Sequence, residues 1–207
     1  MEDVLDLYHQ PYDTRYPVIC FDERPCQLID DVLVPIPMRP GKPKREGYEY
    51  QRKGTCCVLI AFEPHTGNRM IQVKEHRTKV DYANYMKDLI KNYPDAEHIR
   101  LVQDNLNTHN AGSFYKAFSP KEAFELAKKF EYHYTPKKGS WLNMVEIEIS
   151  ALSRQCLDRR IGDIKTLDKE VGAWERERNR IKATIQWEFT KEMAREKLHR
   201  HYLIAQN

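Results

Sequence analysis

The sequence predicts an α/β domain with a mixed five-stranded sheet, flanking helices and a carboxyl-terminal helical extension. The predicted elements run three strands, helix, strand, helix, strand and helix, followed by more helices, and helices interleaved with strands around one sheet are typical of this class. With 207 residues, 41% of them hydrophobic, the chain can bury one sizeable core. Its longest apolar run covers residues 56–62, far short of the roughly 20 residues of a membrane span, so we expect no membrane partner.

Five short apolar segments are the predicted strands. Residues 17–22 and 99–104 carry β-branched residues near their start and end in aspartate, and such runs are typical of buried strands. Residues 55–62 are almost continuously apolar, which predicts a central strand. Residues 69–74 alternate between apolar and polar, and the turn signal at 65–68 predicts a hairpin between these two strands. Residues 131–135 form a fifth short strand that a proline closes.

Helices are predicted where apolar side chains recur at helical spacing. The segments are residues 81–93, 120–130, 140–156, 164–181 and 190–202. A serine or threonine precedes three of them, and a side-chain oxygen at that position accepts a hydrogen bond from the first turn. The expected caps are Ser119, Ser140 and Thr190, the last opening a basic helix that we expect to end near Tyr202.

A basic, proline-rich insertion is expected at about residues 32–53. Four prolines in this stretch exclude a regular helix or a central strand. Its positive charges exceed its negative ones by four, which favours contact with DNA phosphates, although a solvated, mobile insertion is the alternative. The candidate DNA-binding residues are Arg39, Lys42, Lys44, Arg45, Arg52 and Lys53.

Three carboxylates stand where catalysis is expected. Asp22 and Asp104 end two predicted strands, and a buried strand that ends on an unpaired charge is costly. If the strands are parallel neighbours, both carboxylates lie at the same sheet edge and can share a divalent cation. The third comes from the helix after residue 140, where periodicity does not choose between Glu146 and Glu148. Two Mg²⁺ ions about 3.5–4 Å apart, held by such oxygens, support phosphodiester displacement.

Three ordered motifs resemble one family. They are Cys-Phe-Asp-Glu at 20–23, Gln-Asp-Asn-Leu-Asn-Thr-His at 103–109 and Gly-Ser-Trp-Leu-Asn-Met-Val-Glu at 139–146. Together they resemble the DDE catalytic domain of mariner-related bacterial insertion-sequence transposases. The resemblance implies an RNase H-like, retroviral-integrase-like fold over residues 16–205. It also implies that Asp22, Asp104 and Glu146 are the catalytic residues and the metal ligands.

What the resemblance implies for function is Mg²⁺-dependent DNA strand cleavage followed by strand transfer, with Mn²⁺ able to substitute and no small-molecule cofactor. The expected partners are transposon ends and target DNA, with a homodimer assembled on DNA. The expected location is the cytoplasm, at the nucleoid of a bacterium. Residues 1–15 are expected to be the remnant of a linker from a missing amino-terminal DNA-binding region.

Three further residues have candidate supporting roles. His109 could orient a water or contact DNA, or be an ordinary capping or surface histidine; Asn105 could position a ligand or end its strand; Asn143 could assist the site or be an early-helix polar residue. Two other functions stay open. One is an RNase H-like nuclease that does not join strands, and the other is a truncated, non-catalytic DNA-binding or assembly remnant.

Overall fold

The computed structural model describes residues 1–199, and its centre is a mixed five-stranded sheet. The strands are β1 (Val18–Asp31), β2 (Tyr50–Glu63), β3 (Asn68–Lys74), β4 (Ile99–Gln103) and β5 (Phe130–Tyr134), in the spatial order β3-β2-β1-β4-β5. The pairs β1–β2 and β2–β3 are antiparallel, whereas β1–β4 and β4–β5 are parallel. The predicted hairpin and the predicted parallel neighbours are both confirmed.

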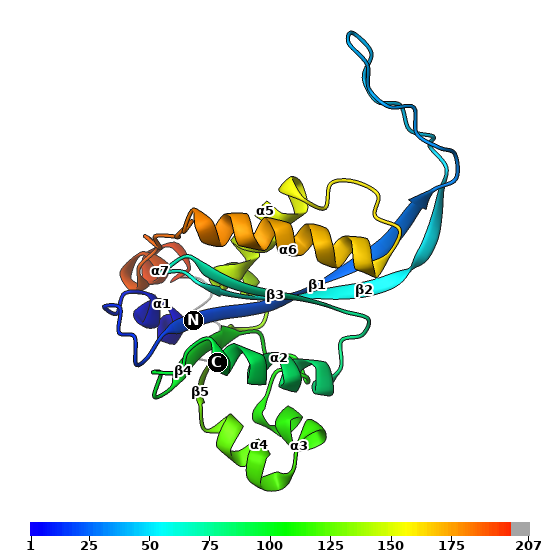
Figure 1. Cartoon of the computed structure of the whole chain (residues 1–207). Coiled ribbons are helices and arrows are strands. Elements are labelled where there is room, and N and C mark those ends of the chain that lie inside the picture. Colours follow the sequence, from blue (N-terminus) through cyan, green and yellow to red (C-terminus); the bar gives the residue numbers. More distant parts are fainter. Residues whose placement is uncertain (200–207) are drawn as a thin grey trace.

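Helices cover both faces of the sheet (Figure 1). They are α1 (Glu2–Tyr8), α2 (Lys79–Lys91), η1 (Ala111–Ser113), α3 (Phe114–Ala117), α4 (Pro120–Ala127), η2 (Ser140–Leu142), α5 (Val145–Gln155), α6 (Ile164–Arg180) and α7 (Lys191–Lys197). One core contains side chains of α1, α5, α6 and α7, and the other contains those of α2, α3 and α4. Successive side chains of β1 alternate between the two cores, as they must on a pleated strand. Asp22 therefore points to the α5 face and Glu23 to the α2 face.

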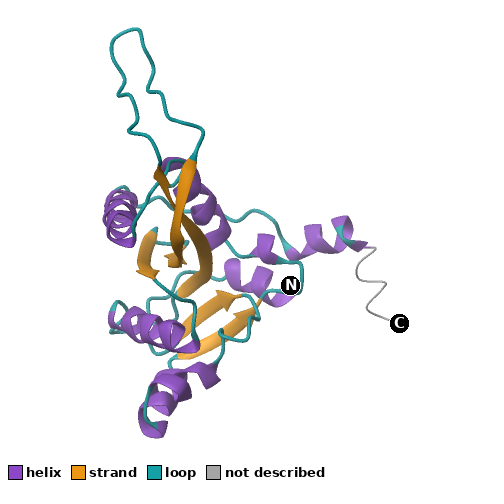
Figure 2. Ribbon diagram, turned by 90° about the vertical axis from the view of Figure 1, so that its right-hand side faces the viewer, coloured by secondary structure: helices purple, strands orange, loops and turns teal. Residues whose placement is uncertain are grey.

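The strands β1 and β2 are much longer than predicted, and the expectation that Asp22 ends its strand is wrong. The parallel pairing of β1 with β4 stops at Cys20, whereas its antiparallel pairing with β2 continues to Asp31. After Cys20, β1 has no strand partner on its second side among the described residues, and proline, which lacks an N–H, is tolerated on such an edge, as at Pro25. The two strands leave the sheet as a ribbon, which Figures 1 and 2 show projecting from the body.

The predicted insertion is the outer part of this ribbon. Residues 32–49 form an extended loop with two isolated bridges, Ile36 to Arg45 and Arg39 to Lys42. Arg52 and Lys53 lie on β2, not in the loop as predicted. The reason is that antiparallel pairing continues past the sheet body, with a register shift between Leu28 and Ile29 opposite Gly54.

Two of the three predicted helix caps are present. Ser119 and Thr190 accept hydrogen bonds from the first turns of α4 and α7. Ser140 instead opens the short η2 helix, and α5 begins at Val145 without a side-chain cap. The extended backbone of Asn143 separates the two helices. The expected end of the last helix, near Tyr202, lies outside the described residues.

The first eight residues are part of the folded body. Val4 and Leu5 are fully buried in the core shared with α5 and α6. A hydrogen bond of 2.8 Å between His133 Nδ1 and Asp3 joins α1 to β5, and an ion pair of 2.7 Å between Lys191 and Asp6 joins α1 to α7. The role of residues 1–15 as a linker stays a prediction. Among the described helices, none is long and apolar enough to cross a membrane.

Candidate active site

Asp22 and Asp104 come from neighbouring parallel strands of the sheet. The last pair between these strands is Cys20 of β1 with Val102 of β4, and Asp22 and Asp104 each follow that pair by two residues. Asp22 points to the face that α5 covers, and α5 carries Glu146 in its first turn. The predicted parallel pairing of the two strands is confirmed, and the charge of Asp104 raises the pKa of Asp22, which indicates that the two carboxylates lie near each other.

The three carboxylates influence one another electrostatically. Burial raises the pKa of Asp22 to about 6, and the negative charges of Glu146 and Asp104 add to the rise, against the backbone N–H of Glu23 that donates at 2.7 Å. Burial and the charge of Asp104 also raise the pKa of Glu146. Like charges that raise one another's pKa are stabilised by a divalent cation placed between them.

The donor set fits a hard divalent cation by its chemistry. All three side chains offer carboxylate oxygens, which Mg²⁺ prefers. Among residues 1–199, no group of three or more His, Cys, Asp or Glu side chains is gathered closely enough to hold a metal ion as it stands. Ligation by the three carboxylates therefore requires their side chains to converge.

Glu146 and Glu148 have opposite surroundings on α5. The Glu148 carboxylate accepts hydrogen bonds from Arg69 Nε at 2.6 Å and from Arg178 Nη2 at 2.8 Å. Burial raises the pKa of Glu148, but the two arginines lower it by more, so the pKa lies below its usual value. Within the described chain, the Glu146 carboxylate has no hydrogen-bond or ion-pair partner. The structure therefore leaves Glu146 available for a ligand and Glu148 engaged in the fold.

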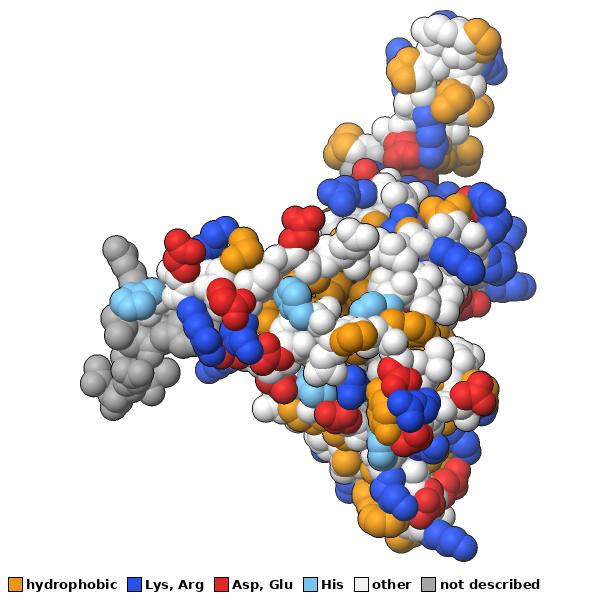
Figure 3. Space-filling model, turned by 90° about the vertical axis from the view of Figure 1, so that its left-hand side faces the viewer, with side chains coloured by type: hydrophobic (Ala, Val, Ile, Leu, Met, Phe, Trp, Pro, Cys, Tyr) orange, Lys and Arg blue, Asp and Glu red, His pale blue; other side chains and the backbone are white. Residues whose placement is uncertain are grey.

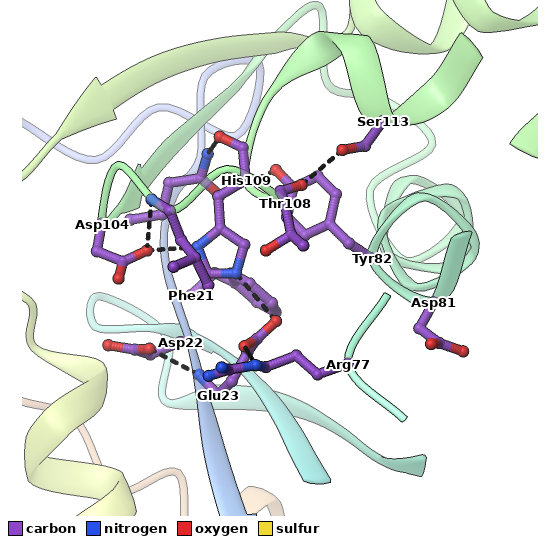
Figure 4. Close-up of polar contacts among 12 residues, drawn as sticks. Phe21, Asp22, Glu23, Arg77, Asp81, Tyr82, Asp104, Thr108, His109 and Ser113 are labelled. Carbon is purple, nitrogen blue, oxygen red and sulfur yellow. Dashed lines mark hydrogen bonds and ion pairs between the residues drawn. The ribbon is translucent and has the colours of Figure 1, made fainter. Parts of the chain in front are cut away.

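His109 bridges the site to the other face of β1, as Figure 4 shows. Its Nδ1 lies 2.5 Å from Asp104 Oδ1 and its Nε2 lies 3.0 Å from Glu23 Oε1. Its ring stacks on Tyr82 and meets the edge of Phe21, each with centroids 5.2 Å apart. The side chain is 1% exposed, so the alternative of a surface histidine is wrong.

Two carboxylates keep His109 charged. Burial lowers its pKa, but hydrogen bonds to Asp104 and Glu23 outweigh burial and raise the pKa to about 9. The same hydrogen bond from His109 holds the pKa of Asp104 below its usual range. Because the imidazolium has both nitrogens engaged as donors, it orients Asp104 and carries no free lone pair.

Sequence reasoning missed two residues that hold this arrangement. Glu23 accepts a hydrogen bond from His109 and also pairs with Arg77 at 3.3 Å. Gln103, fully buried, accepts from Tyr82 Oη and donates to the His109 carbonyl, both at 2.9 Å. The signal for Gln103 was present in the sequence, since an amide inside a buried apolar strand requires hydrogen-bond partners.

The two asparagines have different positions. Asn143 is 1% exposed and donates from Nδ2 to the carbonyl of Phe21 at 2.8 Å, next to Asp22. Its Oδ1 is buried and has no hydrogen-bond partner among residues 1–199. Asn105 is exposed and lines a groove beside Asp104. Asn143 thus holds the backbone of β1 in place at the site, and Asn105 borders the site.

The candidate DNA-binding residues lie apart from the carboxylates. Four are on the loop of the ribbon and two on β2, and all are exposed. Lys44 pairs with Glu46, and Lys53 is 4.0 Å from Asp30. The ribbon also exposes apolar side chains, including Val34 at 92% and Met38 at 74%, and Figure 3 shows basic and hydrophobic groups mixed on it.

Comparison with known proteins places this site in a family. A model of the DDE superfamily endonucleases matches residues 17–168, a range that includes all three carboxylates. A search of curated proteins found no match.

Solved structures of similar fold include the Mos1 mariner paired end complex with Mn, with a TM-score of 0.56 and 14% identity over 84% of this chain and 52% of that one. The Mos1 strand transfer complex has a TM-score of 0.55 and 12% identity over 85% and 53% of the two chains. The chain therefore spans about half the length of these structures. The chain belongs to the DDE superfamily of endonucleases, and its mixed sheet is RNase H-like.

Proposed function

We propose that the chain is the catalytic domain of a DNA transposase that cleaves DNA strands and then joins them to a target. The observation that carries the proposal is the set of three mutually repelling carboxylates, Asp22, Asp104 and Glu146, inside the region that matches the endonuclease family. Glu146 has no hydrogen-bond or ion-pair partner within residues 1–199, and a divalent cation bound there would offset the repulsion among the three carboxylates.

The roles of the residues follow from their surroundings. Asp22, Asp104 and Glu146 hold Mg²⁺, and Mn²⁺ can substitute because it accepts the same oxygen ligands. The bound ions supply activation of the attacking oxygen and stabilisation of the leaving one. His109 keeps its proton at neutral pH and fixes the orientation of Asp104, and Glu23 fixes His109. Asn143 holds the strand that presents Asp22.

DNA is the proposed substrate and partner, as transposon ends and as target. Arg39, Lys42, Lys44 and Arg45 on the ribbon are proposed to contact phosphates outside the catalytic centre, together with Arg52 and Lys53 at its base. The exposed apolar groups of the ribbon favour a second copy of the chain as a further contact, consistent with a homodimer assembled on DNA. The same proposal locates the chain in the cytoplasm, at the nucleoid of a bacterium.

An assay of cleavage and joining tests the proposal. A labelled DNA duplex is incubated with the chain and Mg²⁺ or Mn²⁺, in parallel with the Asp104→Asn variant, which removes a charge and keeps the shape. We expect cut and joined products from the natural chain and neither from the variant. Equal cleavage by both proteins would remove the role of Asp104. Cleavage without joining would favour the nuclease, and binding without either would favour the non-catalytic remnant.

A further inference from the structure

A groove of about 610 Å³ is lined in part by Asp104. Asn105 and the turn after β5, at residues 135–138, also line it, together with Tyr134 and Ser140. Its volume is in the range of pockets that hold molecules of drug size, which is room for a sugar–phosphate unit. The groove is continuous with the catalytic site through Asp104.

Two lysines on the turn give the groove its charge. Lys137 and Lys138 both line it and both are exposed. Neither has a hydrogen-bond or ion-pair partner among residues 1–199, unlike Lys87, Lys91 and Lys191, which pair with carboxylates at 2.7 Å. Two cations without a partner among these residues therefore line the same groove as a proposed metal ligand, Asp104.

The backbone of the turn holds Lys138 in an unusual conformation. The N–H of Gly139 donates to the carbonyl of Pro136 at 2.8 Å, and Lys138 has φ 63°. Glycine or asparagine is less strained in this left-handed region than lysine. Gly139 is needed for a different reason, because a Cβ there would lie 2.6 Å from Pro136 Cγ. The fold would thus accept glycine at 138, and its stability does not account for the lysine.

We propose that this lysine groove binds the DNA phosphodiester next to the one that the three carboxylates hold, an inference that rests on the proposed function. The ammonium groups of Lys137 and Lys138 would neutralise one phosphate, and metal ions on the carboxylates would hold the neighbouring phosphate. A free small anion would be repelled by Asp104, whereas a DNA strand would be held by the lysines and by the metal ions together. The ligand class is therefore a nucleic-acid backbone.

DNA binding without cleavage tests the groove directly. The probe is a short fluorescent DNA duplex in Ca²⁺, and the measurement is anisotropy over a series of salt concentrations. The test variant is Lys137→Ala/Lys138→Gly, and the charge-matched control is Lys116→Ala/Lys121→Ala, two exposed lysines on α3 and α4. We expect the test variant to bind about tenfold more weakly, with a salt slope smaller by about 1.8 for two lost phosphate contacts. The control should bind like the natural chain.

Single substitutions at 138 separate binding from folding. Lys138→Gly removes the charge and relieves the backbone, so we expect an unchanged or higher Tm together with weaker DNA binding. Lys138→Arg should retain the affinity because it restores the cation. Wild-type affinity and salt slope in the test variant would overturn the groove, as would an equal loss in the control or no DNA binding by the natural chain.

Cleavage measured in Mg²⁺ distinguishes this inference from the proposed function. A natural chain that cleaves DNA while the lysine variant binds and cleaves equally well would refute the groove and leave the function standing. A natural chain that binds through the two lysines and never cleaves would leave the groove standing and refute the function.

Discussion

Two glutamate side chains on the helix α5 have opposite electrostatic surroundings. Glu146 and Glu148 are two residues apart, both in the first turn. Glu146 faces Asp104 and Asp22 and its pKa is raised, whereas Glu148 is enclosed by two arginines and its pKa is lowered. The difference teaches that the neighbours of a carboxylate decide whether it serves stability or chemistry.

The Glu148 side joins three elements of the fold. Arg69 of β3 binds Glu148 and also donates to the carbonyls of Gly67 and Ala183, the latter at 2.6 Å. Arg178 brings α6 to the same carboxylate. The Glu146 carboxylate has no hydrogen-bond or ion-pair partner within the described residues. One face of α5 thus secures the helix so that the other can present an unpaired charge.

The largest effect is expected on activity, from Glu146→Gln. The change removes a proposed metal ligand and should reduce Mg²⁺-dependent cleavage at least about a thousandfold, because metal ligation contributes several kcal/mol to the transition state. Relief of carboxylate repulsion should leave Tm unchanged or higher. Cleavage assays and thermal unfolding in chelator measure both. Cleavage by the Glu146→Gln variant near the natural rate would show that Glu146 is not a metal ligand.

The opposite effect is expected from Glu148→Gln. Removing one charge from a buried ion pair leaves the arginines uncompensated, and the free energy of unfolding should fall by about 3–5 kcal/mol. Urea unfolding measures it. Asp88→Asn, which removes an exposed pair with Lys91, is the matched control and should change stability by less than about 1 kcal/mol. A Glu148→Gln variant that is fully stable but inactive would show that Glu148, and not Glu146, has the catalytic role.

A smaller effect is expected in the pH dependence of Asp22→Asn. The folded pKa of Asp22, about 6, lies above its usual value of 3.8, so ionisation of Asp22 destabilises the folded state. That cost arises as pH increases from about 4 to about 6 and is complete above. In chelator the variant should therefore be more stable than the natural chain at neutral pH, by about 3 kcal/mol, which corresponds to about 6–12 °C in Tm for a chain of this size. The gain should vanish near pH 4, and a gain that grows on acidification would contradict the assignment.

The sequence predicted the strands and most of the helices because the signals for these elements are local. Apolar runs, turn residues and caps at Ser119 and Thr190 lie within a few residues of the elements they define. The length of β1 depends on whether β4 continues beside it, which no local pattern reports, so Asp22 was expected at a strand end and lies inside one.

The site divided in the same way. Residue type and order predicted three acidic residues, and the structure confirms the parallel pairing of the strands that carry Asp22 and precede Asp104. The choice between Glu146 and Glu148 from the residues alone required knowing which of them is paired. The partners of Glu148, Arg69 and Arg178, are 79 and 30 residues away from it. The contact of Glu23 with His109 spans 86 residues. Such long-range pairing follows from the fold and not from spacing.

The most direct test of the account is the position of the metal. Anomalous scattering from Mn²⁺-loaded crystals, with DNA bound, locates the ions without relying on activity. The account predicts two peaks about 3.5–4 Å apart, bounded by Asp22, Asp104 and Glu146, with Glu148 still between its arginines. Manganese bound elsewhere, or Glu146 turned away from ions held by other residues, would contradict it.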